Sequence, residues 1–363
     1  MASERLEGKQ WCFYFILFIL GTVIFLSLLE RVNRRVVYDV YSRRPKEDSK
    51  KHAALVAELQ TLSQMVNKTV EEVAQEVLDQ QAVIKEGFCN SDINATSTKT
   101  ELYTEICRNA SNQRMLMVFP VRDRWNLLRS LLKKLLPLLQ KPNLCVFNVV
   151  VEQTDSMAFN KGLLMNAAVI EMAKRVPFDC IIFHDVDLVP ASGDEVYYEC
   201  PSYPRHLSVK VDKFRYSLPY LNLVGGILAL PLRHFLQTNG YSNMFWGWGA
   251  EDDDMFERLS FIGTPVVRPM PNPTRYTMLP HRSSLSLDSW RKTVLLKMAL
   301  KRYRLDGLNS VRYKLLKNDR KSVCEVFGDN LKHCQFGGSY ITHILVDPQK
   351  IESQNAESLL STT

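Results

Sequence analysis

The stretch Met115-Leu116-Met117-Val118-Phe119 is a short, continuously apolar run, which is the pattern of a buried β-strand. A helix follows over Arg124–Leu139, because its leucines recur on one side at helical spacing. The alternation then continues with a strand over Cys145–Val151, a helix over Lys161–Arg175 and a strand over Cys180–His184. Strands and helices in this order predict an α/β fold, with a parallel sheet covered by helices on both faces.

Charged residues follow two of these strands, at the points where the strands end. Arg122 and Arg124 come after the first strand, and Asp185 and Asp187 come after the third. Ligands of open α/β sheets bind beyond the carboxyl ends of the strands. Carboxylates suit Mg²⁺ or Mn²⁺, and arginines can hold a phosphate or a nucleobase edge. The structural alternatives are that the aspartates cap loop amides and that the arginines are solvated residues opening a helix.

The second half of the chain mixes strands and loops and contains no internal repeat. We expect four more strands there, over His206–Val211, Leu223–Leu230, Pro265–Arg268 and Tyr340–Val346.

The segment Trp246–Asp254 reads W-G-W-G-A-E-D-D-D. Its glycines let the backbone approach a ligand closely, and an exposed indole offers a flat platform for a sugar ring. A carboxylate beside that platform could take a proton from a sugar hydroxyl. The structural alternative is an acidic first turn, Glu251 to Asp254, of a helix through Phe256 and Leu259, where negative charge suits the helix dipole.

Met278 and His281 place a thioether and an imidazole three residues apart. Together with a carboxylate they would form an unusual but open ligand set for Mn²⁺. Each residue taken alone is better explained by a structural role.

Composition bounds the class of protein. The chain has 363 residues, 46% of them hydrophobic, enough for one large domain and an appendage. Much of the excess behind the net charge of +7 lies in Arg31–Lys51 and Arg291–Lys321, and neither segment is interleaved with aromatics. We therefore predict no nucleic-acid binding, and leave membrane-proximal or anionic-ligand roles open.

Trp11–Leu29 is a run of nineteen residues without a charge, long enough to span a bilayer. A cleaved signal peptide would have a shorter apolar core, so we favour a signal anchor behind a cytoplasmic tail of residues 1–10. The positive flank at Arg31, Arg34 and Arg35 argues for a cytoplasmic main part. Three glycosylation sequons, at Asn67, Asn94 and Asn109, and seven cysteines after the span argue for a lumenal one, which we choose.

Residues 30–110 have the character of a stem, followed by a catalytic domain over residues 111–350 and a tail over 351–363. Within the stem, apolar residues recur at helical spacing and predict an amphipathic helix. A plain helix is favoured over a short coiled coil that would make a homodimer. The apolar positions are Leu55, Leu59, Leu62, Val66, Val73 and Val77.

Taken together, these motifs resemble the β1,4-galactosyltransferase family, an inverting group of GT-A type that acts on nucleotide sugars. The resemblance covers about residues 107–310, with a further match near Thr342–Asp347. Besides the motifs above, it rests on Phe159-Asn160-Lys161, Pro204-Arg205-His206, Asp212-Lys213-Phe214, Ser217–Tyr220, Gly225-Gly226 and Asp306–Ser310. It implies a Rossmann-like mixed sheet flanked by helices, anchored in the Golgi membrane.

The resemblance also implies the roles of individual residues. Asp252 would be the general base on the acceptor hydroxyl, Glu251 would contact the donor sugar, and Trp248 would link donor and acceptor. Mn²⁺ would be bound by Asp187, Met278 and His281. The UDP-sugar would be held by Pro120, Val121, Arg122, Asp123, Arg124, Phe159, Asn160, Lys161, Asp185, Val186, Lys213, Leu223, Gly226, Ala250 and Asp253.

Leu223 occupies the position at which vertebrate members of the family carry a tyrosine. A branched alkyl chain leaves room for an N-acetyl group, and invertebrate members with Ile or Leu there prefer UDP-GalNAc. The resemblance therefore predicts a β1,4-N-acetylgalactosaminyltransferase acting on a terminal GlcNAc, with UDP-Gal and then UDP-GlcNAc as alternative donors. A different class, an inactive lectin-like protein, is disfavoured because the base and metal residues are present.

The cysteines fit the same resemblance. It implies disulfides between Cys89 and Cys107 and between Cys180 and Cys200. A third pair, Cys324 with Cys334, would bracket an insertion. We expect Cys145 to be a free thiol on its strand, like Cys12 in the span.

Overall fold

The computed structural model describes residues 49–90, 113–141, 144–154, 157–191, 193–270, 273–281, 288–327 and 340–350. The chain divides into two units, one of which is Val66–Lys350 and the other Met1–Met65 with Ile351–Thr363. In the latter the described element is helix α2 (Ser49–Met65). Among the described residues no helix is long and apolar enough to cross a membrane, and the predicted span at 11–29 lies outside them.

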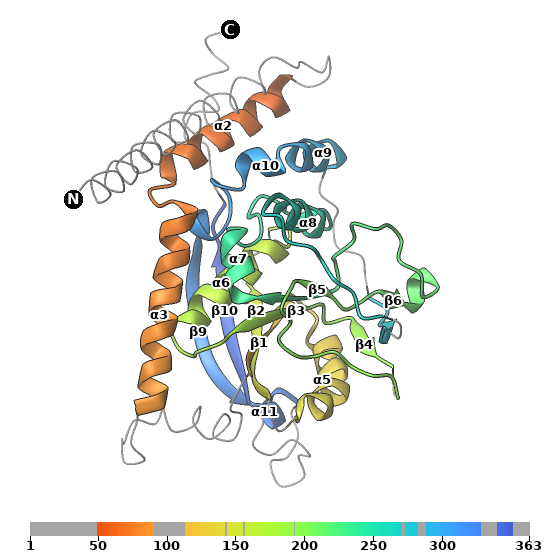
Figure 1. Cartoon of the computed structure of the whole chain (residues 1–363). Helices are drawn as coiled ribbons and strands as arrows, with labels where there is room; N and C mark the ends of the chain where they lie inside the picture. Colours follow the sequence, from red (N-terminus) through yellow and green to blue (C-terminus); the bar gives the residue numbers. More distant parts are fainter. Residues whose placement is uncertain are drawn as a thin grey trace, which may run out of the picture. The chain divides into compact units, whose positions relative to one another are not determined.

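Seven strands form one mixed sheet in the order β5-β7-β3-β1-β2-β10-β9 (Figure 1). β1, β2, β3 and β10 run parallel to one another, while β7, β9 and their neighbours pair antiparallel. The sheet is therefore mixed, as the family resemblance implies. Its strands are β1 (Gln113–Val121), β2 (Leu144–Gln153), β3 (Cys180–His184), β5 (Arg205–His206), β7 (Ile227–Pro231), β9 (Tyr313–Ser322) and β10 (Tyr340–Pro348).

Side chains of the central strand β1 alternate between two hydrophobic cores, because successive residues of a strand point to opposite faces. Leu116 and Val118 pack with helix α6 (Lys161–Ala173) on one face. Met115, Met117 and Phe119 pack with the leucines of α5 (Trp125–Leu139) on the other. The predicted arrangement of helices on both faces is confirmed.

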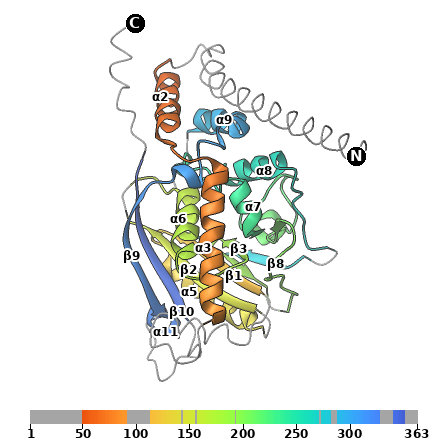
Figure 2. The same cartoon turned by 60° about the vertical axis from the view of Figure 1, so that its left-hand side comes forward.

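Helix α3 (Val70–Asn90) belongs to the unit that holds the sheet and runs beside α6 and α7 (Leu232–Gln237) (Figure 2). The buried Gln81 side chain donates to the carbonyls of Ala173 and Val176, 3.0 Å away in each case, and accepts from the Phe178 amide at 2.8 Å. Val77 is part of the α6 core. The later part of the segment expected to be stem thus packs against the fold, and its apolar stripe is covered by this chain.

A second sheet of three strands lies at the edge of the fold, in the order β4-β8-β6. β4 (Leu188–Pro190) pairs antiparallel with β8 (Arg275–Met278), and β6 (Lys210–Val211) pairs parallel with β8. The remaining described elements are η1 (Asp212–Phe214), α8 (Glu251–Phe261), α9 (Ser289–Lys297), α10 (Ala299–Arg302), η2 (Leu308–Ser310) and α11 (Val323–Phe327).

Three of the strands expected in the second half differ from the structure. The segment at 206–211 divides into β5 and β6, which belong to different sheets. The strand expected from residue 223 begins only at Ile227, because Gly226 has a φ of +86° and breaks the extended run. Residues 265–268 form a single bridge, from Val267 to Arg205.

The predicted disulfide between Cys180 and Cys200 is present, with its Cα atoms 5.4 Å apart. Cys145 is disulfide-bonded as well, so the expectation of a free thiol there is wrong. The apolar strand around Cys145 gave no sign of a partner, because pairing depends on segments distant in the sequence. The pairs implied for Cys89 with Cys107 and for Cys324 with Cys334 include residues outside the described part.

Candidate active site

Asp187, Met278 and His281 come together at one edge of the fold. Asp187 follows β3, and the pairing of β4 with β8 sets Leu188 opposite Met278. The Leu279 amide donates to the Asp187 carbonyl at 2.7 Å, and His281 Nδ1 lies 3.2 Å from Asp187 Oδ2. Residues about ninety positions apart in the sequence are thus brought to one place by the small sheet.

The donor atoms here fit a divalent cation. Asp187 is buried, and within the described residues its Oδ1 accepts no hydrogen bond. Burial and the neighbouring Asp185 raise the pKa of Asp187, which a bound cation would reverse. Among the described residues no three His, Cys, Asp or Glu side chains gather as a metal site, and the ligand role of Met278 stays a prediction.

The arginines after β1 border the same edge. Arg124 Nη1 is 3.9 Å from Asp187 Oδ2. Arg122 donates through Nη1 to the Met157 carbonyl, and its guanidinium lies 5.5 Å from the centroid of the Phe159 ring. Asp123 between them has a φ of +54°, which turns the chain sharply after the strand. Pro120 and Val121 are buried within β1. The result is a cationic rim beside Asp187, suited to phosphate oxygens.

Lys161 joins the end of β3 to the start of α8. Its Nζ lies 2.6 Å from Asp185 Oδ1 and 3.4 Å from Glu251 Oε1. Burial acts to lower the pKa of Lys161, but the two carboxylates outweigh it and hold this pKa above its usual range. Lys161 is therefore a fixed cation between the predicted donor residues.

Asn160, predicted to contact UDP, also holds two segments of the fold together. It is fully buried, and its Oδ1 caps α6 by accepting from the Leu163 amide at 3.0 Å. Its Nδ2 donates to the Asn243 carbonyl at 2.7 Å, which ties α6 to the segment before the tryptophans. Asn160 thus supports the site by fixing the start of α6 and the segment before Trp246.

The W-G-W-G segment turns sharply into α8. Gly247, Gly249 and Ala250 have φ values of +105°, +96° and +81°. This path leaves Trp248 68% exposed, with Lys292 Nζ of α9 lying 5.0 Å from the centroid of its ring. The predicted acidic first turn is confirmed, because Glu251 to Asp254 form the first turn of α8. The indole is presented to solvent, and its role as a sugar platform stays a prediction.

Asp252 borders a small cavity that is also lined by Lys161, Gly225, Gly226 and Glu251. A Cβ on Gly225 would lie 2.3 Å from Asp252 Oδ2, so the carboxylate packs on bare backbone. Burial, with Glu251 and then Asp253, raises the pKa of Asp252 to about 7. A carboxylate with this pKa is suited to accept a proton near neutral pH.

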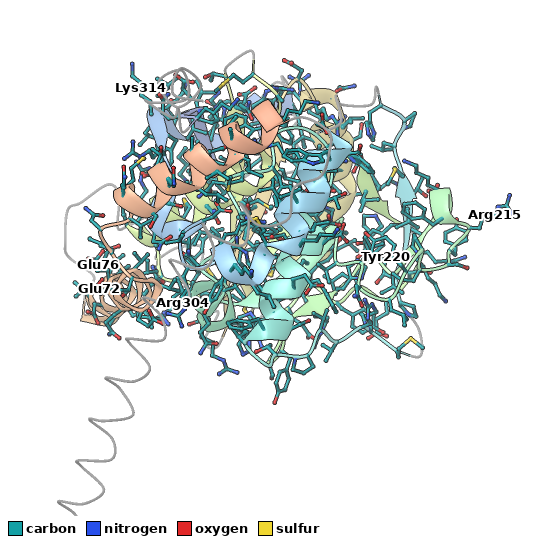
Figure 3. The ribbon with its side chains drawn as sticks, turned by 90° about the horizontal axis from the view of Figure 1, so that it is seen from above. Glu72, Glu76, Arg215, Tyr220, Arg304 and Lys314 are labelled. Carbon is teal, nitrogen blue, oxygen red and sulfur yellow. A yellow bond between two sulfur atoms is a disulfide. The ribbon has the colours of Figure 1, made fainter. Side chains whose placement is uncertain are left out.

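Four other predicted donor residues lie outside the lining of this cavity. Leu223 Cδ1 would lie 3.5 Å from a Cβ on Gly225, which places this side chain beside Asp252. Asp253 accepts from the Tyr220 hydroxyl at 2.8 Å, and Figure 3 marks where Tyr220 lies. Val186 is buried in the core against α5. Lys213 lies on η1, with its Nζ 5.9 Å from the centroid of the Phe214 ring.

Sequence reasoning missed three residues that build this site. Asp212 Oδ1 accepts from the Met278 amide at 2.9 Å and so supports β8, the strand that carries the predicted ligand Met278. Arg268 Nη2 donates to the Leu223 carbonyl at 3.1 Å and fixes the turn that carries this side chain. Lys292 Nζ lies over the Trp248 ring, 5.0 Å from its centroid. The only local signal was the Asp212-Lys213-Phe214 motif, and the rest depends on tertiary contacts.

Comparisons with known proteins agree with this geometry. Residues 57–201 match the model of the N-terminal region of glycosyl transferase group 7, and residues 205–282 match a model described as the N-terminal domain of galactosyltransferase. Together the two matches cover more than half of the chain. The chain therefore belongs to the galactosyltransferase family of glycosyltransferase group 7.

Individual relatives point the same way. β-1,4-Galactosyltransferase 5 of Mus musculus is 39% identical over 200 residues, which are 55% of this chain and 51% of that protein. β-1,4-Galactosyltransferase 2 of Mus musculus is 37% identical over 216 residues, which are 58% of each. The chain thus spans about half the length of the curated relatives it matches.

Among solved structures, the chain is similar to a Drosophila β1,4-galactosyltransferase 7 mutant in complex with manganese, UDP-Gal and xylobiose. The TM-score is 0.53 and the identity 28%, over 66% of this chain and 95% of that one. The catalytic domain of the same Drosophila protein with xylobiose gives a TM-score of 0.52.

Proposed function

We propose that the protein is an inverting β1,4-galactosyltransferase, which moves a hexose from a UDP-linked donor to a sugar hydroxyl. One observation carries the proposal above all. Asp252, whose pKa is raised to about 7, borders a cavity shared with Lys161 and Glu251, close to the exposed Trp248. A base, a donor-side cation and a sugar platform are the parts that a single displacement needs.

In this mechanism Asp252 accepts the proton of the acceptor hydroxyl, which attacks the anomeric carbon of the donor as the bond to diphosphate breaks. Attack from the face opposite the leaving group inverts the configuration, so an α-linked donor yields a β-glycoside. Lys161, held between Asp185 and Glu251, keeps the donor-side carboxylates in place. The arginines at 122 and 124 would orient the diphosphate.

Asp187, Met278 and His281 would hold Mn²⁺, the metal named with the Drosophila neighbour. When bound, the ion supplies Lewis-acid neutralisation of the departing diphosphate. The buried and unpartnered Asp187 Oδ1 supports this assignment within the described residues.

For the donor we propose UDP-galactose, since the relatives and the structural neighbour are named as galactosyltransferases. This reverses the order predicted from Leu223. UDP-GalNAc remains a second candidate, because the leucine side chain lies beside the Asp252 cavity and brings no aromatic ring there. A terminal GlcNAc is the proposed acceptor, and xylobiose in the neighbour supports a sugar acceptor in general terms.

Placement in the cell is proposed from the sequence. The apolar run at 11–29 supports a single-pass type II protein of the Golgi membrane with a lumenal catalytic domain. An inactive lectin-like protein is the alternative class, and it is disfavoured because the base and the metal ligands converge in the fold.

The experiment is a donor comparison on the detergent-solubilised full chain. With Mn²⁺ and a terminal β-GlcNAc acceptor, UDP-Gal, UDP-GalNAc and UDP-GlcNAc are supplied separately and the products are identified by mass spectrometry. We expect transfer with UDP-Gal foremost, and loss of transfer in Asp252→Asn. Preference for UDP-GalNAc would keep the class of enzyme and restore the argument from Leu223. Binding of UDP without transfer from any donor would contradict the proposal and favour the lectin-like protein.

A further inference from the structure

We propose that Arg302 is a positioning residue for the acceptor side of the site, because its guanidinium fixes helices α8 and α9 against each other. α8 carries Asp252, and α9 carries Lys292, which lies over Trp248. The inference rests on the proposed function for its meaning, but it concerns a residue behind the site.

Arg302 is fully buried, and each of its N–H groups has a partner. Nε and Nη2 donate to the Leu295 carbonyl of α9, 3.2 Å away from each nitrogen. Nη2 also donates to Asp254 Oδ1 of α8, and Nη1 donates to Asp306 Oδ2 and, at 2.7 Å, to Ser242 Oγ. One planar cation thus holds four segments, a task that the single ammonium of a lysine cannot perform.

The contact with α8 fixes the rotation of its first turn. Asp254 comes two residues after Asp252, so the two side chains lie on opposite sides of the helix. Asp254 is fully buried against Arg302 and against Arg258, whose Nε is 2.7 Å from Asp254 Oδ2. With Asp254 held inward, Asp252 is directed to the cavity beside Gly225.

The contact with α9 fixes the position of Lys292 beside Trp248. Leu295 lies three residues after Lys292, on the same side of α9. Lys292 Nζ is 3.1 Å from the place where a Cβ on Gly249 would lie, as well as 5.0 Å from the Trp248 ring centroid. A displacement of α9 would therefore alter the surroundings of the sugar platform directly.

The segment that leads to the platform is held by the same group. The Arg302 guanidinium lies 5.2 Å from the centroid of the Phe245 ring, one residue before the W-G-W-G motif, and Ser242 precedes that ring by three residues. Arg302 thus reaches both ends of the loop that carries Trp248, through Phe245 at its start and Asp254 after its end.

The test separates acceptor binding from donor binding in Arg302→Lys. Intrinsic tryptophan fluorescence gives the Kd of UDP-Gal with Mn²⁺, and then the Kd of a terminal β-GlcNAc disaccharide in the presence of UDP and Mn²⁺. We expect the acceptor Kd to rise about tenfold or more, since a displacement of α8 or α9 by about 1 Å would misplace the side chains that contact the acceptor. The donor Kd should stay within about twofold, because Arg122, Arg124 and Lys161, which are placed at the diphosphate, lie outside α8 and α9.

Arg258→Lys is the matched control. Arg258 also holds Asp254 and Asp306, but its other described contacts are to the carbonyls of Thr238 and Gly240, not to α9. Arg258→Lys should lower the melting temperature by about as much as Arg302→Lys does and leave the acceptor Kd unchanged. Arg304→Lys is a surface control, because Arg304 pairs with Glu71 and lies near Glu72 and Glu76, away from Tyr220 (Figure 3).

If Arg302→Lys does not fold, Ser242→Ala removes one partner of the guanidinium and should raise the acceptor Kd about threefold or less. Equal acceptor Kd changes in the Arg302 and Arg258 variants, or no change in either, would overturn the inference. Failure of the proposed function is distinguishable, because it appears as absence of transfer in the wild type. The split between donor and acceptor binding does not depend on transfer.

Discussion

Replacing Asp252 by Asn should abolish transfer and, at neutral pH, make the protein more stable. Burial and the adjacent carboxylates of Glu251 and Asp253 raise the pKa of Asp252 from its ordinary 3.8 to about 7. A raised folded-state pKa means that the fold prefers the protonated form. The stability associated with this group is complete below about pH 4 and is lost as the pH rises to about 7.

The size of the effect follows from the same numbers. A difference of about three pKa units corresponds to about 4 kcal/mol, since each unit is worth about 1.4 kcal/mol. Because the Asp252 side chain is only partly buried, water screens its charge. We therefore expect ionised Asp252 to destabilise the fold by roughly 1 to 3 kcal/mol at pH 8. Asparagine has nearly the same shape and no charge, so the variant should regain that amount.

We would measure this stability gain by thermal and urea unfolding of the wild type and of Asp252→Asn, at pH 4 and at pH 8. The gain in the free energy of unfolding should be near zero at pH 4. At pH 8 it should raise the melting temperature by about 2–4 °C for each kcal/mol gained. Glu257→Gln, a charge removal further along α8, is the control for helix charge alone. The reasoning would be refuted if the stability difference between Asp252→Asn and wild type were the same at both pH values. Transfer by the variant near the wild-type rate would refute it as well.

Three further predictions concern neighbouring residues. Gly225→Ala places a Cβ 2.3 Å from Asp252 Oδ2, so kcat should fall about a hundredfold while UDP still binds, measured by initial rates and UDP titration. His281→Ala should raise the Mn²⁺ concentration for half-maximal activity by about tenfold or more, and an unchanged metal titration would remove it from the ligand set. Leu223→Tyr should shift the ratio of UDP-GalNAc to UDP-Gal use toward UDP-Gal; a constant donor ratio would place the selecting pocket elsewhere.

The first half of the fold could be predicted because its signals are local. The strand over Cys180–His184 is observed with the predicted bounds, and the helix predicted over Arg124–Leu139 begins one residue later. In these segments apolar periodicity and burial agree, because both faces of the central strands are covered.

Strand β9 gave no such signal. Half of its sequence, YKLLKNDRKS, is charged, and all of its residues are exposed or half-buried. An edge strand needs little apolar pattern, since it is held by its backbone pairing with β10 from Tyr313 to Ser322. That pairing depends on a partner strand almost twenty residues further along, and no local window contains both.

The acidic run shows most clearly where sequence reasoning stops. Asp252 and Asp254 are identical residues two positions apart in one helical turn, yet one borders the cavity and the other is fully buried between two arginines. The sequence shows four adjacent carboxylates, and a helix start suits all of them equally. What separates them is the rotation of α8, which is held through Asp254 by Arg258 of the same helix and by Arg302, about fifty residues away. Burial and then repulsion raise the pKa of Asp252, and the fold tolerates both because Asp254 in the same turn is held by buried cations.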